Sequence, residues 1–170
     1  MIWVVGFIIL LFGFVVFRGA PYVPSRRKYI ERAFTELYPL SKKDVLVDVG
    51  SGDGIVLRIA AEHGAKAIGL ELNPALVGIS RWLSRGNANV EVRLVDFWLK
   101  PIPDDTTIVY GFMVTRDIEK IEKKMQQETN RLGRPVRFMT YGSELIEHTP
   151  DAELVGYHLY TFNPLQSDEA

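Results

Sequence analysis

The segment VDVGSGDG, residues 47–54, carries most of what this 170-residue chain reveals about its architecture. Apolar residues here run into a turn with a glycine at every second position, and the apolar stretch from Ile55 to His63 predicts a helix directly afterwards. Glycine tolerates a positive φ and has no Cβ, so such a turn brings backbone N–H groups close to a ligand. The segment therefore predicts a strand, a loop that binds a nucleoside-containing cofactor, and a helix.

The charge of this loop indicates which cofactor it suits. Its spacing is Gly50-x-Gly52-x-Gly54, whereas the dinucleotide fingerprint G-x-G-x-x-G seats a pyrophosphate on the following helix. Asp48 on the strand and Asp53 in the loop would repel a diphosphate, which disfavours a nucleotide oxidoreductase. A cofactor that carries an ammonium and a sulfonium fits better, and S-adenosylmethionine is such a cofactor. The structural alternative is a tight turn without a ligand.

Carboxylates also follow the next two predicted strands. Glu71, in the segment GLELNP, lies roughly 20 residues after the glycine loop, where a second parallel strand would end beside the first and a carboxylate can accept both ribose hydroxyls. A third strand, residues 90–95, ends in Asp96-Phe97-Trp98, which offers a carboxylate for an adenine amino group and aromatic faces for its ring. The alternative for Asp96 is a turn cap. Three strand ends thus supply three parts of one predicted cleft.

Alternation of strands and helices sets the predicted fold class. Strand-length apolar runs rich in β-branched residues occupy residues 45–49, 66–70, 90–95, 107–112, 135–141 and 154–162. Helical patterns occupy residues 25–38, 55–63, 74–86 and 116–132. This order predicts an α/β fold with a Rossmann-like, doubly wound, mostly parallel sheet and a ligand at the carboxyl ends of its strands.

The first residues predict a membrane anchor. Met1 to Phe17 contains no charged residue and would form about 25 Å of helix, while basic residues begin only at Arg18. The positive-inside rule then places the C-terminal domain in the cytoplasm. A cleaved signal peptide and a buried helix are the alternatives. The expected organisation is a transmembrane anchor (1–19), a linker with a packing helix (20–40), a cofactor-binding domain (41–165) and a tail (166–170).

Composition excludes several kinds of site. A net charge of −1 gives no general case for nucleic-acid binding. The absence of cysteine rules out disulfides, thiolate nucleophiles and zinc-thiolate sites, and the three histidines show no ligand spacing. We therefore expect no metal.

In this order, the motifs VDVGSGDG, GLELNP and RLVDFW resemble those of the class I S-adenosylmethionine-dependent methyltransferases. The likeness is closer to the membrane-anchored lysine methyltransferases related to those that act on the ATP synthase c-subunit and on the adenine nucleotide translocase. It extends over residues 20–162 and includes PYVPS (21–25), Ser80-Arg81, and Glu122-Lys123-Lys124. The resemblance implies the class I methyltransferase fold.

The resemblance also implies roles for individual residues. The glycine loop would hold the methionine part of the cofactor with Asp48 near its amino group, Glu71 would hold the ribose, and Asp96 with Phe97 would hold the adenine. The residues expected to bind the cofactor are Asp48, Gly50, Ser51, Gly52, Asp53, Gly54, Glu71, Leu72, Asn73, Asp96 and Phe97. After the fourth strand the relatives carry a Pro-Gln step, but this chain reads YGFMVT from Tyr110. Tyr110 is either an acceptor-side residue or a tyrosine at the edge of the core.

The resemblance implies a methyltransferase that uses S-adenosylmethionine to methylate a protein lysine. With the predicted anchor, we expect it to act at the cytoplasmic membrane surface on a membrane protein. Desolvation near the sulfonium lowers the pKa of the acceptor amine, so no dedicated catalytic base is expected. One alternative is a methyltransferase for a lipid or quinone head group. Another is a membrane-tethered module that binds the cofactor without turnover.

Overall fold

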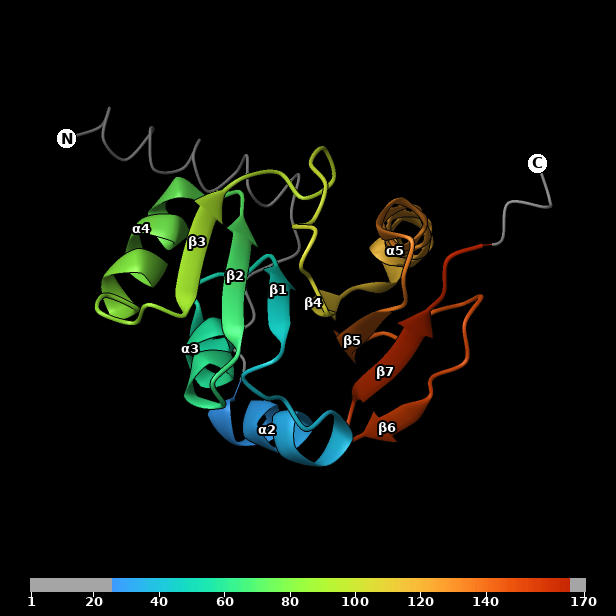
Figure 1. Ribbon diagram of the computed structural model, residues 1–170, viewed down its shortest axis with the longest axis horizontal. Coiled ribbons are helices and arrows are strands. Elements are labelled where there is room, and N and C mark those ends of the chain that lie inside the picture. Colours follow the sequence, from blue (N-terminus) through green and yellow to red (C-terminus); the bar gives the residue numbers. More distant parts are fainter. Residues whose placement is uncertain (1–25, 166–170) are drawn as a thin grey trace.

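A seven-stranded sheet with the order β3-β2-β1-β4-β5-β7-β6 forms the centre of the computed structural model, which describes residues 26–165 (Figure 1). The strands are β1 (Val45–Val49), β2 (Lys66–Glu71), β3 (Val90–Leu94), β4 (Ile108–Met113), β5 (Val136–Gly142), β6 (Ala152–Leu154) and β7 (Tyr157–Phe162). The helical segments are α2 (Arg27–Arg32), the π-helix η1 (Ala33–Leu37), α3 (Ile55–Glu62), α4 (Pro74–Leu83), the 3₁₀ turn η2 (Thr115–Asp117) and α5 (Ile118–Leu132). The first five strands are parallel, which confirms the predicted Rossmann-like α/β sheet.

The strand order reverses between β1 and β4. From β1 the chain builds outward through β2 to β3, then crosses to the other side and continues with β4 and β5. Val49, the last residue of β1, lies opposite Leu70 of β2 and Gly111 of β4. In an open α/β sheet, ligands bind beyond the carboxyl ends of the strands at such a reversal. The glycine loop follows β1 directly, so it lies at this point.

Two hydrophobic cores cover the two faces of the sheet. On one face, side chains of α2, η1 and α3, among them Ile30, Phe34 and Leu57, pack on alternate strand residues. On the other face α5 contributes Ile121 and Met125. Figure 1 shows α2 and α3 on one side of the strands and α5 on the other. Because successive side chains of a strand point to opposite faces of the sheet, the same strands contribute to both cores.

Within the described residues, the β3–β4 and β5–β6 connections contain no helix. Instead they cover part of the α5 face with the buried side chains of Phe97, Ile102 and Leu145. Glu122 of α5 is buried and accepts a hydrogen bond from the backbone N–H of Glu147 at 2.8 Å, which fastens the β5–β6 connection. Two loops therefore take the place of helical cover.

The C-terminal part of the sheet differs from the expectation of one strand over residues 154–162. Val155 has a φ of 42° and Gly156 a φ of 80°, and this left-handed pair forms the turn between β6 and β7. Since β7 runs antiparallel to both β5 and β6, the segment completes the sheet as a hairpin. The side chains alternate on both sides of the turn, and this continuous alternation led to the prediction of a single strand.

The predicted helix over residues 25–38 also differs at its end. Its last turn widens into η1, where the Tyr38 N–H donates to the Ala33 carbonyl at 2.9 Å. The predicted cap, Ser25, lies outside the described residues.

The predicted membrane localisation is corrected by the structure. Among residues 26–165, no helix has the length and apolarity needed to cross a bilayer. This finding overturns the expectation of a single-pass membrane protein with its domain on the cytoplasmic side. The segment assigned as the anchor, residues 1–19, lies outside the described residues.

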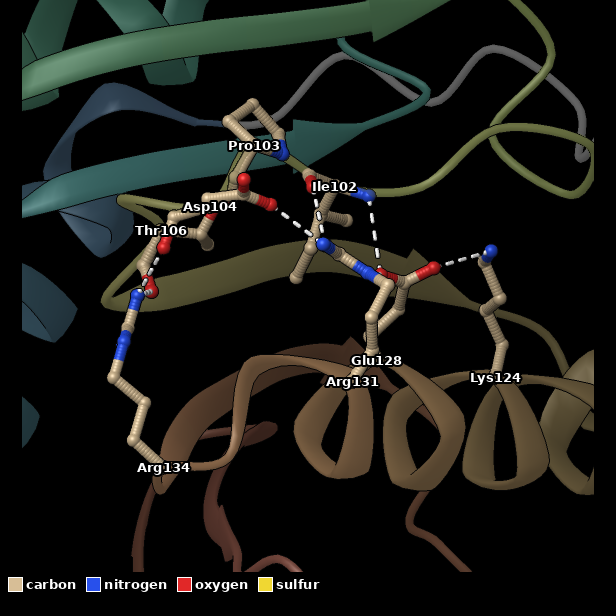
Figure 2. A network of polar contacts seen from close by, with 8 residues as sticks. All are labelled: Ile102, Pro103, Asp104, Thr106, Lys124, Glu128, Arg131 and Arg134. Carbon is tan, nitrogen blue, oxygen red and sulfur yellow. Dashed lines mark hydrogen bonds and ion pairs between the residues drawn. The ribbon is translucent and has the colours of Figure 1, made fainter.

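A buried carboxylate joins α5 to the β3–β4 connection. Glu128 accepts hydrogen bonds from Lys124 Nζ at 2.6 Å and Arg131 Nε at 2.8 Å, and also from the Ile102 backbone N–H at 3.3 Å (Figure 2). Arg131 reaches the same loop, because its Nη2 donates to the Ile102 carbonyl at 2.6 Å. The network lies near the end of α5 and before β4 begins, so it positions the helix rather than the ligand crevice.

We predict that Glu128→Ala lowers the free energy of unfolding by about 2 to 4 kcal/mol, because it leaves a buried N–H and two cations without their shared acceptor. Urea unfolding followed by circular dichroism measures this change. Glu119→Ala, an exposed site on the same helix, is the matched control and should change stability by less than about 0.5 kcal/mol. Equal stability of the two variants would contradict a structural role for Glu128.

Candidate cofactor-binding site

The glycine loop adopts a conformation that only glycine accepts easily. Gly50, Gly52 and Gly54 have φ angles of 76°, 55° and 78°, and the Gly54 N–H donates to the Ser51 carbonyl at 2.9 Å. Space is also restricted, since a Cβ on Gly54 would overlap with Ser80 Oγ on α4. The loop is therefore packed tightly between the end of β1 and helix α4.

Glu71 links this loop to the end of the neighbouring strand. Its side chain is only 6% exposed, and its two oxygens accept the backbone N–H groups of Gly52 at 2.9 Å and Asn73 at 2.7 Å. Asn73 in turn caps α4, because its Oδ1 accepts the Ala75 N–H at 2.9 Å. Each Glu71 oxygen keeps a further lone pair beyond these two bonds, and a ribose hydroxyl is a suitable donor to it.

Asp48 places a buried carboxyl beside the glycine loop. This residue of β1 is 3% exposed, and burial raises the pKa of its carboxyl well above the usual range, with further increases from the nearby carboxylates of Glu71 and Asp53. Two carboxylates that raise the pKa of the Asp48 carboxyl favour a cationic ligand beside it, because a positive charge stabilises the ionised form of Asp48. The arrangement matches a ligand that carries an ammonium group.

Asp53 is held by a residue that the sequence interpretation missed. Arg58 Nη1 donates to the Asp53 carbonyl at 2.6 Å, and Nη2 lies 3.5 Å from Asp53 Oδ2. The Asp53 carboxylate also accepts the Ile55 N–H at 3.1 Å, at the start of α3. The signal was present in the sequence, since an arginine one turn into the helix can reach back to the loop before it.

The third strand end lies beside the second. The Val95 N–H donates to the Glu71 carbonyl at 3.0 Å, which brings Asp96 next to the ribose-side carboxylate. Asp96 acts as a turn cap, accepting the Trp98 N–H at 2.9 Å, and Phe97 is buried in the core on the α5 side. Trp98 stays half-buried, with Lys120 Nζ 3.9 Å from its ring centroid. The adenine contacts of Asp96 and Phe97 stay predictions.

Ser51, Leu72 and Tyr110 were also expected at the site. Ser51 is buried between the loop and β2, where a Cβ on Gly69 would lie 2.5 Å from Ser51 Oγ, and Leu72 is half-buried just after Glu71. Tyr110 is 2% exposed and pairs edge-on with Phe34 at 6.2 Å. Its ring belongs to the core, and its acceptor-side role stays a prediction.

A basic cavity opens near the carboxyl end of β4. Its volume is about 370 Å³, and it lies between the start of α5 and the β5–β6 connection. Its lining comprises Thr115, Arg116, Glu119, Lys120, Lys123 and Ile146. Three cations and one acid line it, so its mouth suits an acidic group of a partner molecule. In residues 26–165, no cluster of three or more His, Asp or Glu side chains is placed to hold a metal ion.

Known proteins resemble this chain in sequence and in fold, although no family model matches it. The lysine N-methyltransferase of the ATP synthase c-subunit from Homo sapiens is 34% identical over 111 residues, which cover 64% of this chain and 46% of that protein. A protein-lysine N-methyltransferase of Saccharolobus islandicus is 30% identical over 115 residues, which cover 64% of this chain and 69% of that protein. The chain thus spans about half the length of the human relative.

A solved structure shares nearly the whole fold. The RNA methyltransferase of Salinibacter ruber, in complex with S-adenosyl-L-homocysteine, superposes with a TM-score of 0.71 and 27% identity, over 87% of this chain and 98% of that chain. The resemblance and the cofactor expected from the motifs are confirmed by these relatives. This chain belongs to the S-adenosylmethionine-dependent protein-lysine methyltransferases.

Proposed function

We propose that this protein transfers a methyl group from S-adenosylmethionine to the ε-amino group of a lysine side chain in a protein. The observation that carries the proposal is the buried carboxylate of Glu71, which the Gly52 and Asn73 N–H groups hold at the reversal of strand order. This geometry supports a nucleoside cofactor there, and the lysine methyltransferases among the relatives support the acceptor.

Each acid of the site is assigned to a different part of the cofactor. In this proposal Glu71 accepts the ribose hydroxyls, and Leu72 and Asn73 flank it. The loop from Gly50 to Gly54 surrounds the methionine part, with Asp48 beneath its ammonium. Asp96 and Phe97, after β3, lie on the adenine side. An ammonium beside Asp48 relieves the cost of ionising a buried carboxyl, so binding and charge neutralisation are coupled.

When bound, S-adenosylmethionine supplies a methyl group activated by a sulfonium. The lone pair of the lysine nitrogen forms the new N–C bond while the S–C bond breaks, its electron pair stays on sulfur, and the nitrogen loses one proton to water. The protein orients the two groups and excludes solvent. Desolvation beside a positive charge lowers the pKa of the acceptor amine. Deprotonation of the amine therefore requires no dedicated base among the described side chains.

Incubation with S-adenosylmethionine carrying a labelled methyl group tests the reaction. Cell extract is fractionated into protein, lipid and RNA, and the protein fraction is hydrolysed to amino acids. We expect the label in methylated lysine. Label confined to organic-extractable material would favour a lipid or quinone acceptor, and cofactor binding without any transfer would favour a binding module.

RNA is a second candidate acceptor. The Salinibacter ruber neighbour is described as an RNA methyltransferase, and a basic cavity lies beside the end of β4. The net charge of −1 argues against general phosphate binding. Label recovered in nucleosides rather than in lysine would establish this alternative.

We predict that Glu71→Ala weakens binding of S-adenosylhomocysteine by about 1 to 3 kcal/mol, because hydrogen bonds to a charged acceptor are lost. Isothermal titration calorimetry measures the affinity, and the melting temperature shows whether the variant is folded. Glu91→Ala serves as the control, since Glu91 is exposed on β3 and pairs with Arg93. If the folded Glu71 variant bound as tightly as the control, the ribose assignment would be wrong.

We predict that Asp48→Asn raises the melting temperature of the ligand-free protein and weakens cofactor binding. Burial raises the pKa of Asp48, so its neutral form stabilises the fold below about pH 4, and this contribution is lost as pH rises through the raised value. The increase in melting temperature of the Asp48→Asn variant over the wild-type protein should therefore be small at pH 4 and larger at pH 8.

Thermal unfolding at both pH values measures this difference. Asp105→Asn is the control, because Asp105 is exposed and its pKa is lowered by its hydrogen bond with Lys66. That variant should gain no stability as pH rises. An Asp48 variant whose advantage did not grow with pH would contradict the charge argument.

A further inference from the structure

Three aromatic side chains stand in a row at the carboxyl edge of the sheet. Phe112 of β4 lies opposite Tyr141 of β5, and Tyr141 lies opposite Tyr157 of β7. Tyr141 and Tyr157 stack with centroids 4.7 Å apart, and Phe112 and Tyr141 lie 5.9 Å apart. We refer to these three rings as the aromatic row.

The aromatic row lies on the same face of the sheet as Asp48. Asp48 pairs in register with Tyr110, and Phe112 follows Tyr110 by one alternation of β4. Because Val49 pairs with Gly111, Phe112 stands level with Gly50, the first residue of the glycine loop. The row thus extends from the cofactor crevice along β4, β5 and β7.

The rings differ in accessibility in a way that suits a binding surface. Tyr157 is 1% exposed and pairs with Tyr110 at 6.3 Å, so it forms the floor. Phe112 and Tyr141 are half-buried, which leaves parts of both side chains open to solvent. Burial raises the pKa of Tyr157 to about 12, so its hydroxyl stays neutral beside a cation at physiological pH.

The backbone beside the row adopts unusual conformations. Gly142 has a φ of 105°, and a Cβ there would lie 3.3 Å from the Phe112 ring. Its N–H donates to the Gly156 carbonyl at 3.0 Å, so the end of β5 is tied to the β6–β7 turn. In that turn Val155 has a φ of 42° although it is β-branched, and it is 64% exposed. Strained backbone of this kind concentrates at ligand-binding positions.

We propose that the aromatic row binds the alkyl chain and ammonium of the acceptor lysine, with Phe112 and Tyr141 in contact and Tyr157 beneath them. The inference rests on the proposed function and names the acceptor surface of that site. The quadrupole of an aromatic ring makes its face partially negative, so the face attracts ammonium and methylammonium groups. The apolar area of the ring also packs on the lysine methylenes. A partly methylated lysine is held by the same surface, which favours repeated methylation.

The test uses the full chain saturated with S-adenosylhomocysteine, and Nα-acetyl-Nε-trimethyllysine amide as the probe. Its affinity is measured by NMR titration and compared with that of the neutral analogue with a tert-butyl group in place of trimethylammonium. We expect the cation to bind about 5- to 30-fold more tightly than the neutral analogue. Equal affinities would overturn the proposal.

Variants identify the surface. Phe112→Leu and Tyr141→Leu keep apolar bulk but remove the ring, so the preference for the cation should fall to near unity. Tyr141→Phe should retain it, and so should Trp82→Leu, which removes an exposed ring on α4. Affinity for S-adenosylhomocysteine should stay unchanged in all four variants. Unchanged affinity shows that each variant is folded. A preference that survived both ring-to-leucine changes would place the acceptor elsewhere.

The labelling experiment separates this inference from the proposed function. If the wild-type protein yields labelled methyllysine and the two leucine variants yield as much, only the aromatic row is refuted. If the wild-type protein yields no methyllysine in any fraction, the proposed function fails and the inference fails with it.

Discussion

The Glu71 carboxylate is the constraint on which the ligand crevice depends. It is buried, yet its charge is satisfied by two backbone N–H groups from segments that meet only in the folded sheet, one in the glycine loop and one at the start of α4. A buried acceptor that lost either partner would carry a desolvation cost of about 1 to 3 kcal/mol. The loop and the end of β2 are therefore fixed relative to each other before any ligand arrives, and a preformed site loses less entropy on binding.

The crevice combines this rigid element with an energetically unfavourable one. Asp48 lies in β1, inside the sheet, with its pKa raised by burial and by two neighbouring acids, and no stability argument accounts for a carboxyl group there. Functional sites commonly keep such groups because the ligand supplies the missing counter-charge. Asp53 differs, because the protein itself supplies a cation there: Arg58 Nη2 lies 3.5 Å from Asp53 Oδ2. The crevice thus keeps one acid for the ligand and balances another internally.

The sequence was most informative where local pattern and tertiary structure agree. The strands around the crevice lie within a residue or two of their predicted positions, because apolar runs bounded by glycine and proline leave little choice. Val155 shows the opposite case: valine favours extended backbone, but the hairpin between β6 and β7 imposes a left-handed conformation. The sequence left two roles open for Tyr110, and the packing of Phe34 against it shows that its ring belongs to the core. The aromatic row could not be found from the sequence, because it depends on the register of three strands.

The loops that replace helical cover between β3 and β4 and between β5 and β6 have a consequence for cooperativity. Phe97, Ile102 and Leu145 bury themselves in the same cluster as α5, and Glu122 and Glu128 anchor both loops to that one helix. Detaching α5 would therefore release both loops and open one whole side of the sheet. Amide protons of α5 and of the strand residues beneath it should then exchange with solvent as a single unit, at a free energy close to that of complete unfolding.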